Sequence, residues 1–339
     1  VVPLPTIRDV ASRAGVAPIT VSRVINDSDY VSQATRERVE TAIEELGYVP
    51  NMLGPSLRFK QTMTLALVLT DITNPFWTTV ARGVEDVAQA SGYSIILCNT
   101  DESEVKQEQY LNMLLRRRID GIILVPVRSV PEPVHTIQKQ DIPVVVLDRQ
   151  IPGLDVDIVR ADSEDGAYQL TEHLLSLGHR RITMLAGPQT VSTAVDRVAG
   201  FRRALADAGL PENEAEIYWG SFTIDSGREM AKKALTGTQK PTAFFAGNNF
   251  VAIGAIHALR EEGLRVPNDI ALVTVDDIPP SLSIDPFLTV AAQPALEMGH
   301  QAAQLLLDRV TGALDSERQH TILPTQLIIR ASSGQCLAS

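Results

Sequence analysis

The stretch TIRDVASRAGVAPITVSRVIN, residues 6–26, contains two short helical patterns separated by a tight turn. Apolar residues recur at the spacing of one helix face after Thr6, a residue type that favours helix N-caps. Gly15 can adopt the positive φ of a sharp turn, and Pro18 fits the first turn of a second helix. The pattern therefore predicts two helices joined at Gly15.

A third helical pattern follows from Ser32, and Gly47 is placed to end it. Three short helices with a small-residue turn between the first two are typical of a helix-turn-helix. In that motif the second helix enters the major groove of DNA while the first crosses the backbone. A helical cap on the rest of the chain has the same pattern, so the pattern alone leaves both interpretations open.

The charge is unevenly distributed along the 339 residues, whose formal net charge is −11. Residues 1–60 contain equal numbers of basic and acidic side chains, so the negative excess lies beyond residue 60. A neutral N-terminal segment is compatible with DNA binding, whereas the acidic remainder argues against general attraction to nucleic acid. The two cysteines, Cys98 and Cys336, have no neighbours at metal-ligand spacing.

No apolar run reaches the roughly 20 residues that span a bilayer. The first residues also lack the charged and apolar regions of a signal peptide. We therefore expect a soluble cytoplasmic protein with no membrane partner.

From residue 62 onward, short apolar runs alternate with amphipathic stretches. Near-continuous apolar strands joined by crossover helices predict parallel sheets covered on both faces. The predicted strands lie in residues 65–70, 93–99, 121–126, 143–148, 181–187, 215–220, 242–247 and 270–276. Eight strands are too many for one small sheet, and the chain divides naturally into two groups of four strands near residues 161–162. We expect an α/β fold with two doubly wound parallel sheets in two lobes.

Two such lobes could also form an enzyme, but no catalytic motif supports that alternative. No glycine-rich dinucleotide fingerprint follows the first predicted strand, and the chain contains no Walker lysine motif, GxSxG elbow or HExxH. We therefore expect no enzyme activity, no catalytic residue, no bound metal and no cofactor.

Ligands of open α/β sheets bind beyond the carboxyl ends of the strands. Polar and aromatic residues occupy those positions throughout the two predicted sheets. Carboxylates, amides and guanidinium groups can grip several hydroxyls, and flat rings can cover the apolar face of a sugar. The predicted ligand-binding residues are Asp71, Asn74, Phe76, Trp77, Asp148, Arg149, Arg197, Phe222, Asn248, Asp276 and Gln293.

The motifs DVA, AGV, TVSRV, VSQATRERV and ELGYVPN resemble, in this order, the headpiece of the lactose/galactose repressor (LacI/GalR) family of transcription regulators. The resemblance continues almost to the C-terminus. It implies a DNA-binding headpiece in residues 1–49, a hinge in 50–61 and a dimerising effector domain in 62–339. That domain would be similar to periplasmic sugar-binding proteins, with lobe 1 in about 62–161 and 293–322, and lobe 2 in about 162–292 and 323–339.

The resemblance also assigns DNA contacts. Pro18, Ile19 and Arg23 occupy base-reading positions, and an arginine can contact a guanine edge. Thr6, Thr20, Ser22 and Asn26 are placed for phosphates, which set register. Leu57 matches an apolar wedge for the minor groove. Gly54-Pro55 stands where the family has Ala-Arg, so a flexible tether is the alternative to an ordered hinge helix.

In the effector domain, the resemblance implies the contact set of ribose-type sugar-binding proteins, with Trp77 in place of a phenylalanine. Asn249 stands where the family has aspartate, which indicates either helix capping or altered specificity. A monosaccharide is the expected ligand, and a phosphorylated or acidic sugar remains an alternative.

We therefore expect a homodimeric, sugar-responsive repressor that reads near-palindromic double-stranded DNA and leaves it when the sugar binds. The alternative is a transport-type sugar-binding protein, which shares the effector domain but lacks a helix-turn-helix. The identity of the sugar, and its action as inducer or corepressor, are left open by the sequence.

Overall fold

The computed structural model describes residues 5–27, 30–49, 61–211, 216–237, 240–278, 285–314 and 317–335. The chain forms two compact units, Val1–Thr62 and Met63–Ser339. We refer to the first as the headpiece and to the second as the body. None of the helices in the described residues combines the length and apolar character needed to cross a membrane.

The headpiece contains α1 (Ile7–Ala14), α2 (Pro18–Ile25) and α3 (Gln33–Leu46), as the sequence predicts. At the start of α1, the backbone N and Oγ1 of Thr6 both donate a hydrogen bond to Asp9 Oδ2, each over 2.7 Å. Gly15 has φ +67° after α1, the positive value that the tight turn requires. A small apolar core holds the three helices together and consists of Val10, Ala11, Ala14, Val21, Val24, Val39 and Ala42.

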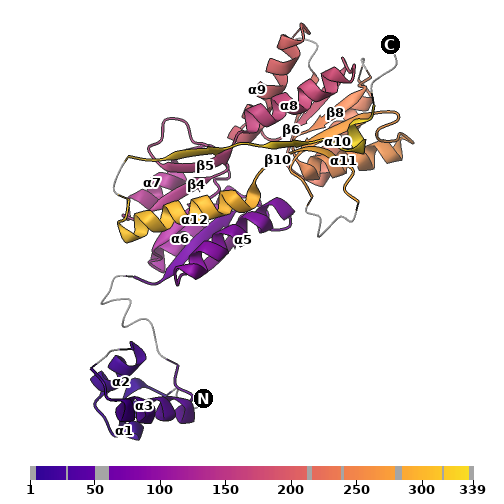
Figure 1. Ribbon diagram of the computed structural model, residues 1–339. Coiled ribbons are helices and arrows are strands. Elements are labelled where there is room, and N and C mark those ends of the chain that lie inside the picture. Colours follow the sequence, from indigo (N-terminus) through magenta and orange to yellow (C-terminus); the bar gives the residue numbers. More distant parts are fainter. Residues whose placement is uncertain are drawn as a thin grey trace. The chain divides into compact units, whose positions relative to one another are not determined.

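The first lobe of the body is a six-stranded parallel sheet. Its strand order is β11 (His320–Leu323), β5 (Asp157–Ala161), β4 (Val144–Leu147), β3 (Gly121–Leu124), β1 (Thr64–Leu69), β2 (Ser94–Asn99). One face packs on α5 (Pro75–Ala90) and α12 (Ala295–Thr311), which lie side by side (Figure 1). The other face packs on α6 (Glu104–Arg116) and α7 (Glu132–Gln138).

The second lobe repeats this plan with a six-stranded sheet. Its strand order is β12 (Gln326–Ile328), β10 (Thr289–Ala292), β9 (Ala271–Val275), β8 (Ala243–Ala246), β6 (Ile182–Ala186), β7 (Glu216–Trp219). Helices α8 (Ser163–Ser176) and α9 (Ser192–Asp207) cover one face. Helices α10 (Ile224–Leu235) and α11 (Asn249–Glu261) cover the other, and a short 3-10 helix η2 (Ala331–Ser333) follows β12.

The predicted two-lobed α/β architecture is confirmed, with four strands beyond the eight predicted runs and one antiparallel pair. All eight runs predicted as strands form strands, and β5, β10, β11 and β12 lie outside those runs. Strand β5 was missed because Asp157 and Arg160 interrupt its apolar run. Strand β12 pairs with β10 in the antiparallel direction, so the second sheet is not wholly parallel.

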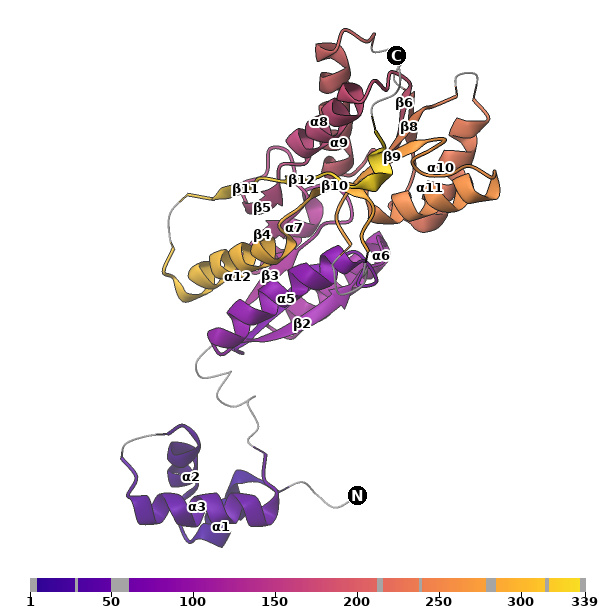
Figure 2. The ribbon, with the colours of Figure 1, turned by 45° about the vertical axis from the view of Figure 1, so that its right-hand side comes forward.

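The chain passes between the two lobes three times. It leaves the first lobe after β5, returns to it from β10 into α12, and leaves it again from β11 into β12. Figure 2 shows these crossing segments close together at the boundary of the lobes. The lobes can therefore move relative to each other only by bending at these three segments.

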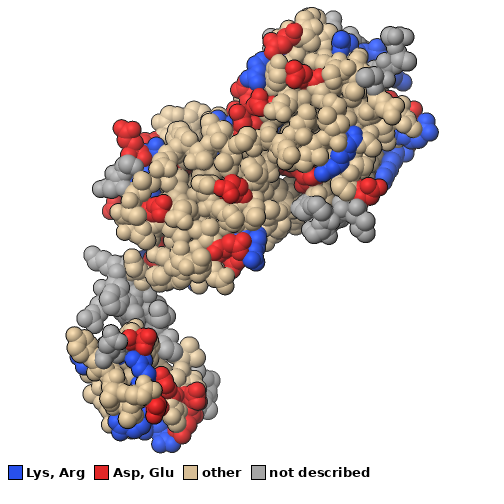
Figure 3. All heavy atoms as spheres, in the orientation of Figure 1, with Lys and Arg blue, Asp and Glu red and all other residues tan. Residues whose placement is uncertain are grey.

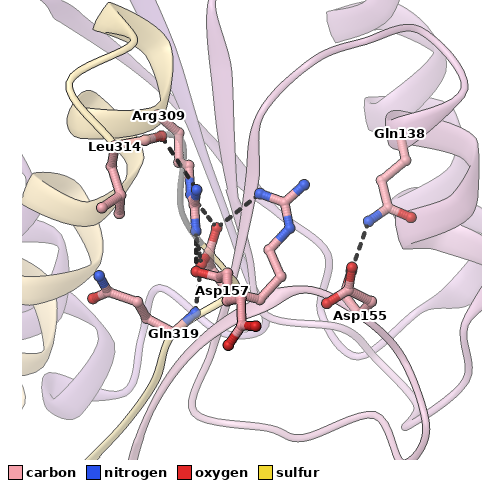
Figure 4. Close-up of polar contacts among 8 residues, drawn as sticks. Gln138, Asp155, Asp157, Arg309, Leu314 and Gln319 are labelled. Atoms are coloured by element: carbon pink, nitrogen blue, oxygen red, sulfur yellow. Dashed lines mark hydrogen bonds and ion pairs between the residues drawn. The ribbon is translucent and has the colours of Figure 1, made fainter.

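A buried carboxylate anchors the segment between α12 and β11 within the first lobe. Asp157, at the start of β5, is fully buried. Arg309 of α12 donates from Nε and Nη2 to the two oxygens of Asp157, each over 2.9 Å. The backbone N of Gln319 donates to Oδ1 over 2.8 Å, and Arg318 lies 3.4 Å away (Figure 4). Asp157 thus joins β5, α12 and the segment that enters β11.

Helices α5 and α12 touch backbone to backbone at two glycines. A Cβ atom at Gly83 would lie 2.3 Å from the carbonyl oxygen of Leu296, and one at Gly299 would lie 2.2 Å from that of Val80. Real Cβ atoms do not approach carbonyl oxygens so closely. The absence of side chains at these positions therefore sets the distance between the two helices.

We expect Gly299→Ala to destabilise the body by about 1–3 kcal/mol or more, because α12 must move away from α5 to admit the methyl group. Urea unfolding followed by circular dichroism measures the difference. Gln301→Ala, at an exposed position of the same helix, is the control and should change stability by less than about 0.5 kcal/mol. Equal stabilities of the two variants would contradict the close contact.

Candidate functional site

The second helix of the headpiece exposes the residues predicted to read bases. Ile19 is 55% exposed, and Pro18 and Arg23 are also exposed, whereas Val21 and Val24 face the core. The exposed isoleucine offers an apolar contact and the exposed arginine offers hydrogen-bond donors to a molecule that covers this surface. This surface of α2 is the candidate DNA-binding face.

Arg23 differs from two neighbouring arginines. Arg13 pairs with Glu45 over 2.6 Å, and Arg36 pairs with Asp27 over 2.8 Å. Arg23 has no ion pair with any residue that the structure describes. Basic and acidic atoms both appear on the face of the headpiece shown in Figure 3, in keeping with its even charge balance.

Some of the residues predicted to contact phosphates make hydrogen bonds within the headpiece. Thr20 and Ser22 are half-buried, and Thr6 and Asn26 are exposed. Asn26 Nδ2 donates to the carbonyl oxygen of Ser22 over 2.7 Å, and the Thr6 hydroxyl donates to Asp9. Leu57 and Gly54-Pro55 lie outside the described residues.

A cavity of about 530 Å³ lies between the two lobes of the body. Its volume is within the range of small-molecule sites. All the residues predicted from strand ends line this cavity: Asp71, Asn74, Phe76, Trp77, Asp148, Arg149, Arg197, Phe222, Asn248, Asp276 and Gln293. We refer to it as the effector cavity.

The wall also contains residues that the sequence analysis missed. They include Thr70, Asp101, Glu102, Arg128 and Thr193. Asp101 and Glu102 directly follow β2, so the same strand-end rule could have identified them. Thr193 lies in the first turn of α9, where strand-end spacing gives no signal.

Two buried aspartates follow β4 and β9 in the same unusual backbone conformation. Asp148 has φ +66° and Asp276 has φ +70°, and each is 5% exposed. Non-glycine residues in this region are strained, and such strain is concentrated at functional sites. Burial raises the pKa of Asp148 to about 6, against the opposing effect of Arg197 and Arg149. Burial also raises the pKa of Asp276.

The pKa of Asp148 predicts a pH-dependent contribution to stability. Because the folded value is about 6 and the usual value is 3.8, the folded protein retains a proton that the unfolded chain releases. The contribution of Asp148 to the free energy of unfolding therefore falls by about 3 kcal/mol in total as pH rises from about 4 to about 6. Above that range the contribution is constant.

Asp148→Asn removes this contribution. The free energy of unfolding of the variant, minus that of the unmodified protein, should therefore rise from about pH 4 to about pH 6. Urea unfolding of both proteins at pH 4.5, 5.5 and 7 gives the difference, in which the other titrating groups cancel. A difference that does not change with pH would contradict the raised pKa.

Arg197 of α9 faces these carboxylates. It is 3% exposed, and its Nη1 donates to the carbonyl oxygen of Gly247 over 2.8 Å. Its guanidinium lies over the ring of Phe222, 5.6 Å from the centroid. The cation is thus held rigidly at the cavity wall, between a ring and two carboxylates.

Arg149 lines the cavity but is committed to Glu102. Its Nη1 and Nη2 donate to the two carboxylate oxygens of Glu102 over 2.9 and 2.5 Å. Nη1 also donates to the carbonyl oxygens of Pro126 and Val127. Nε and the second N–H of Nη2 are left for another partner, so Arg149 can offer a ligand at most two hydrogen bonds and little net charge.

The lobes are joined by a reciprocal pair of amides. Asn74 Nδ2 donates to Asn249 Oδ1 over 2.9 Å, and Asn249 Nδ2 donates to Asn74 Oδ1 over 3.0 Å. The two oxygens also accept from the backbone N of Phe76 and of Phe250. Both side chains are buried, and each is oriented by the helix that it begins. This Asn74–Asn249 pair connects the starts of α5 and α11.

The lobes also meet at a second place, near the start of α9. The backbone N of Ser129 donates to the carbonyl oxygen of Thr190 over 3.1 Å. Ser192 accepts at Oγ from the backbone N of Gln150 over 2.9 Å and donates from its own N to Ser129 Oγ over 3.0 Å. Hydrogen bonds thus join the lobes in two separate regions.

Five buried polar atoms on the cavity wall have no hydrogen-bond partner among the described residues. They are Thr70 Oγ1, Asp148 Oδ1, Arg149 Nε, Arg197 Nε and Gln293 Oε1. Buried polar groups are almost always paired, since an unpaired one costs about 1–3 kcal/mol. The mixture of donors and acceptors matches a ligand that carries several hydroxyls.

The described residues contain no group of three or more His, Cys, Asp or Glu side chains placed to hold a metal ion. The groups on the cavity wall offer a ligand hydrogen bonds, charge and ring stacking.

Comparison with known proteins relates both units to one family. Bacterial regulatory proteins of the lacI family match residues 6–51. Periplasmic binding proteins and the sugar binding domain of the LacI family match residues 62–331. The transcriptional repressor PurR of Photobacterium profundum is 36% identical over 329 residues, which cover 96% of this chain and 98% of the relative.

Two solved structures are similar over nearly the whole chain. The Lac repressor dimer bound to operator and the anti-inducer ONPF has a TM-score of 0.84 and 29% identity, covering 98% of this chain and 99% of that one. The complex of the transcriptional regulator CelR with cellobiose has a TM-score of 0.74 and 35% identity, covering 97% and 99%.

Proposed function

Because this chain belongs to the LacI family of bacterial DNA-binding transcription regulators, we propose that it is a homodimeric repressor that leaves its operator when a sugar fills the effector cavity. The family consists of regulators, which agrees with the prediction that the chain is not an enzyme.

The observation that carries the sugar assignment is the set of unpaired polar atoms on the cavity wall. They lie with the rings of Phe76, Trp77 and Phe222 around one space. Hydroxyls can satisfy both donors and acceptors, and the C–H face of a sugar ring can lie against an aromatic ring. The cellobiose bound by the similar regulator CelR supports the same ligand class.

The DNA assignment is supported by the exposed residues of α2. We assign base contacts to Pro18, Ile19 and Arg23, and the guanidinium of the exposed Arg23 can pair with a guanine edge. Thr6, Thr20, Ser22 and Asn26 are assigned to phosphates, and residues 50–61 to the linker. A two-fold dimer, as in the similar Lac repressor, favours a near-palindromic operator.

The mechanism requires that the sugar bind one arrangement of the two lobes more tightly than the other. A ligand shifts an equilibrium only by its difference in affinity for the two states. The cavity wall is contributed by both lobes, so a ligand that touches both favours the arrangement in which they approach. Movement of the first lobes in the dimer then changes the spacing of the two headpieces.

A transport-type sugar-binding protein is the alternative with the same body. The match of residues 6–51 to the DNA-binding segment of the family argues against it, because such transport proteins need no helix-turn-helix.

The test combines operator selection with a ligand screen. Full-length protein selects operator sequences from random DNA, and fluorescence anisotropy then measures binding of the selected DNA with each of a panel of sugars. Nucleobases belong in the panel, because the three rings could also stack on a base. We expect a near-palindromic sequence and release by at least one sugar. Release by a nucleobase alone would disprove the sugar assignment, and selection of no preferred sequence would disprove the regulatory one.

A further inference from the structure

We propose that the effector cavity discriminates by charge, so that it accepts an uncharged polyhydroxyl ligand and rejects phosphorylated and acidic sugars. This inference rests on the proposed sugar-responsive function and names the ligand class of that site. Each described cation on the cavity wall has carboxylates around it.

Arg149 and Arg128 are already neutralised by carboxylates. Arg149 makes two hydrogen bonds to Glu102, and the Arg149 side chain is 2% exposed, whereas that of Glu102 is 34% exposed. Arg128, at the cavity rim, pairs with Glu104 over 2.9 Å. Neither arginine offers an anionic ligand an uncompensated positive charge.

Arg197 is the third arginine on the wall, and it faces two carboxylates. Its charge favours the ionised forms of both Asp148 and Asp276, which are each 5% exposed. One cation therefore balances two buried anions, and a third anion beside them would be repelled. Charges interact more strongly in such a buried place than in water.

The unpaired atoms favour the same ligand class. Gln293 Oε1 can only accept a hydrogen bond, and the same is true of Asp148 Oδ1 when Asp148 is ionised. Both atoms therefore require ligand groups that donate. Gln293 is fixed in this orientation, because its Nε2 donates to Asp276 Oδ1 over 2.6 Å. Hydroxyls donate and accept, whereas a carboxylate or a fully ionised phosphate only accepts.

Size does not account for the discrimination. A cavity of about 530 Å³ has room for more than a single monosaccharide, so a phosphate substituent would fit by volume. Charge is therefore the property by which the wall separates a sugar from its phosphate ester or its acid.

The experiment uses matched pairs of probes on the full-length protein. The pairs are D-glucose with glucose 6-phosphate, D-ribose with ribose 5-phosphate, and D-galactose with galacturonate, together with cellobiose. Isothermal titration calorimetry at pH 7.5 gives the affinities, and Trp77 in the cavity wall reports binding there by fluorescence. We expect the neutral member of at least one pair to bind at least about tenfold more tightly than its anionic partner.

Asp148→Asn removes one of the two buried carboxylates and should narrow the difference between the members of that pair by about tenfold. Glu229→Gln changes the net charge equally at an exposed position of α10, so it should leave the difference unchanged. Circular dichroism establishes that both variants fold.

Each remaining outcome is decisive. Equal or tighter binding of an anionic member overturns the charge inference and leaves the sugar-responsive function standing. An undiminished difference in Asp148→Asn overturns the assignment of the discrimination to these carboxylates. If none of the probes binds, the sugar-responsive function fails, and the charge inference falls with it.

Discussion

Arg197→Ala is expected to weaken effector binding by about a hundredfold or more, while DNA affinity without effector changes little. Truncating one member of a buried charged group costs about 2–5 kcal/mol, because the remaining charges lose their partner. Here both Asp148 and Asp276 would lose the cation that faces them, and Phe222 would lose a packing partner. Calorimetry with the sugar found in the screen measures the loss, and anisotropy measures operator binding.

Arg202→Ala is the matched control for this prediction. Arg202 lies on the same helix but is exposed, so its removal should leave effector affinity unchanged. Equal effects of the two substitutions, in folded proteins of similar stability, would show that Arg197 acts through the helix and does not act at the cavity.

The second large effect is expected in the headpiece. Arg23→Ala should reduce the preference for the operator over scrambled DNA by roughly 1–3 kcal/mol for each half-site, because a bidentate contact to a base is lost. Non-specific affinity should fall much less, since it depends on phosphate contacts. Competition binding measures the preference, and the rise in melting temperature with the sugar should stay the same.

Arg38→Ala provides the comparison, because Arg38 is an exposed arginine on α3 and lies outside the candidate base-reading helix. That variant should lose some affinity for all DNA and keep its sequence preference. Loss of sequence preference in Arg38→Ala, or retention of sequence preference in Arg23→Ala, would show that the assignment of base reading to α2 is wrong.

The location of the cavity could be predicted from sequence because it depends on local patterns. Apolar runs identify strands, parallel strands align their carboxyl ends, and the residues that follow, such as Asp148 and Asp276, must meet at one edge. Strand β5 was missed for the same reason, since the buried Asp157 breaks the pattern and its partner Arg309 is far away in the chain.

The roles of individual side chains could not be predicted, because they depend on partners distant in sequence. Arg149 occupies a strand end like Asp148, yet its guanidinium is taken by Glu102. Asn249 was interpreted as a helix cap or a change in specificity, and the structure gives it a partner on the other lobe. The base contacts proposed for α2 come from the resemblance, whereas the helical pattern alone indicated only that Ile19 and Arg23 point away from the core.

The Asn74–Asn249 pair has a consequence for the dose response of the regulator. Its two hydrogen bonds join the lobes through the protein's own side chains, and neither group titrates between pH 4 and 9. Each bond of about 1 kcal/mol multiplies the ratio of closed to open molecules about fivefold. The fraction of protein already closed sets both the background expression without sugar and the sugar concentration at half response. Sensitivity can therefore be adjusted at Asn249, which is outside the set of residues that line the effector cavity, without altering a group assigned to the sugar.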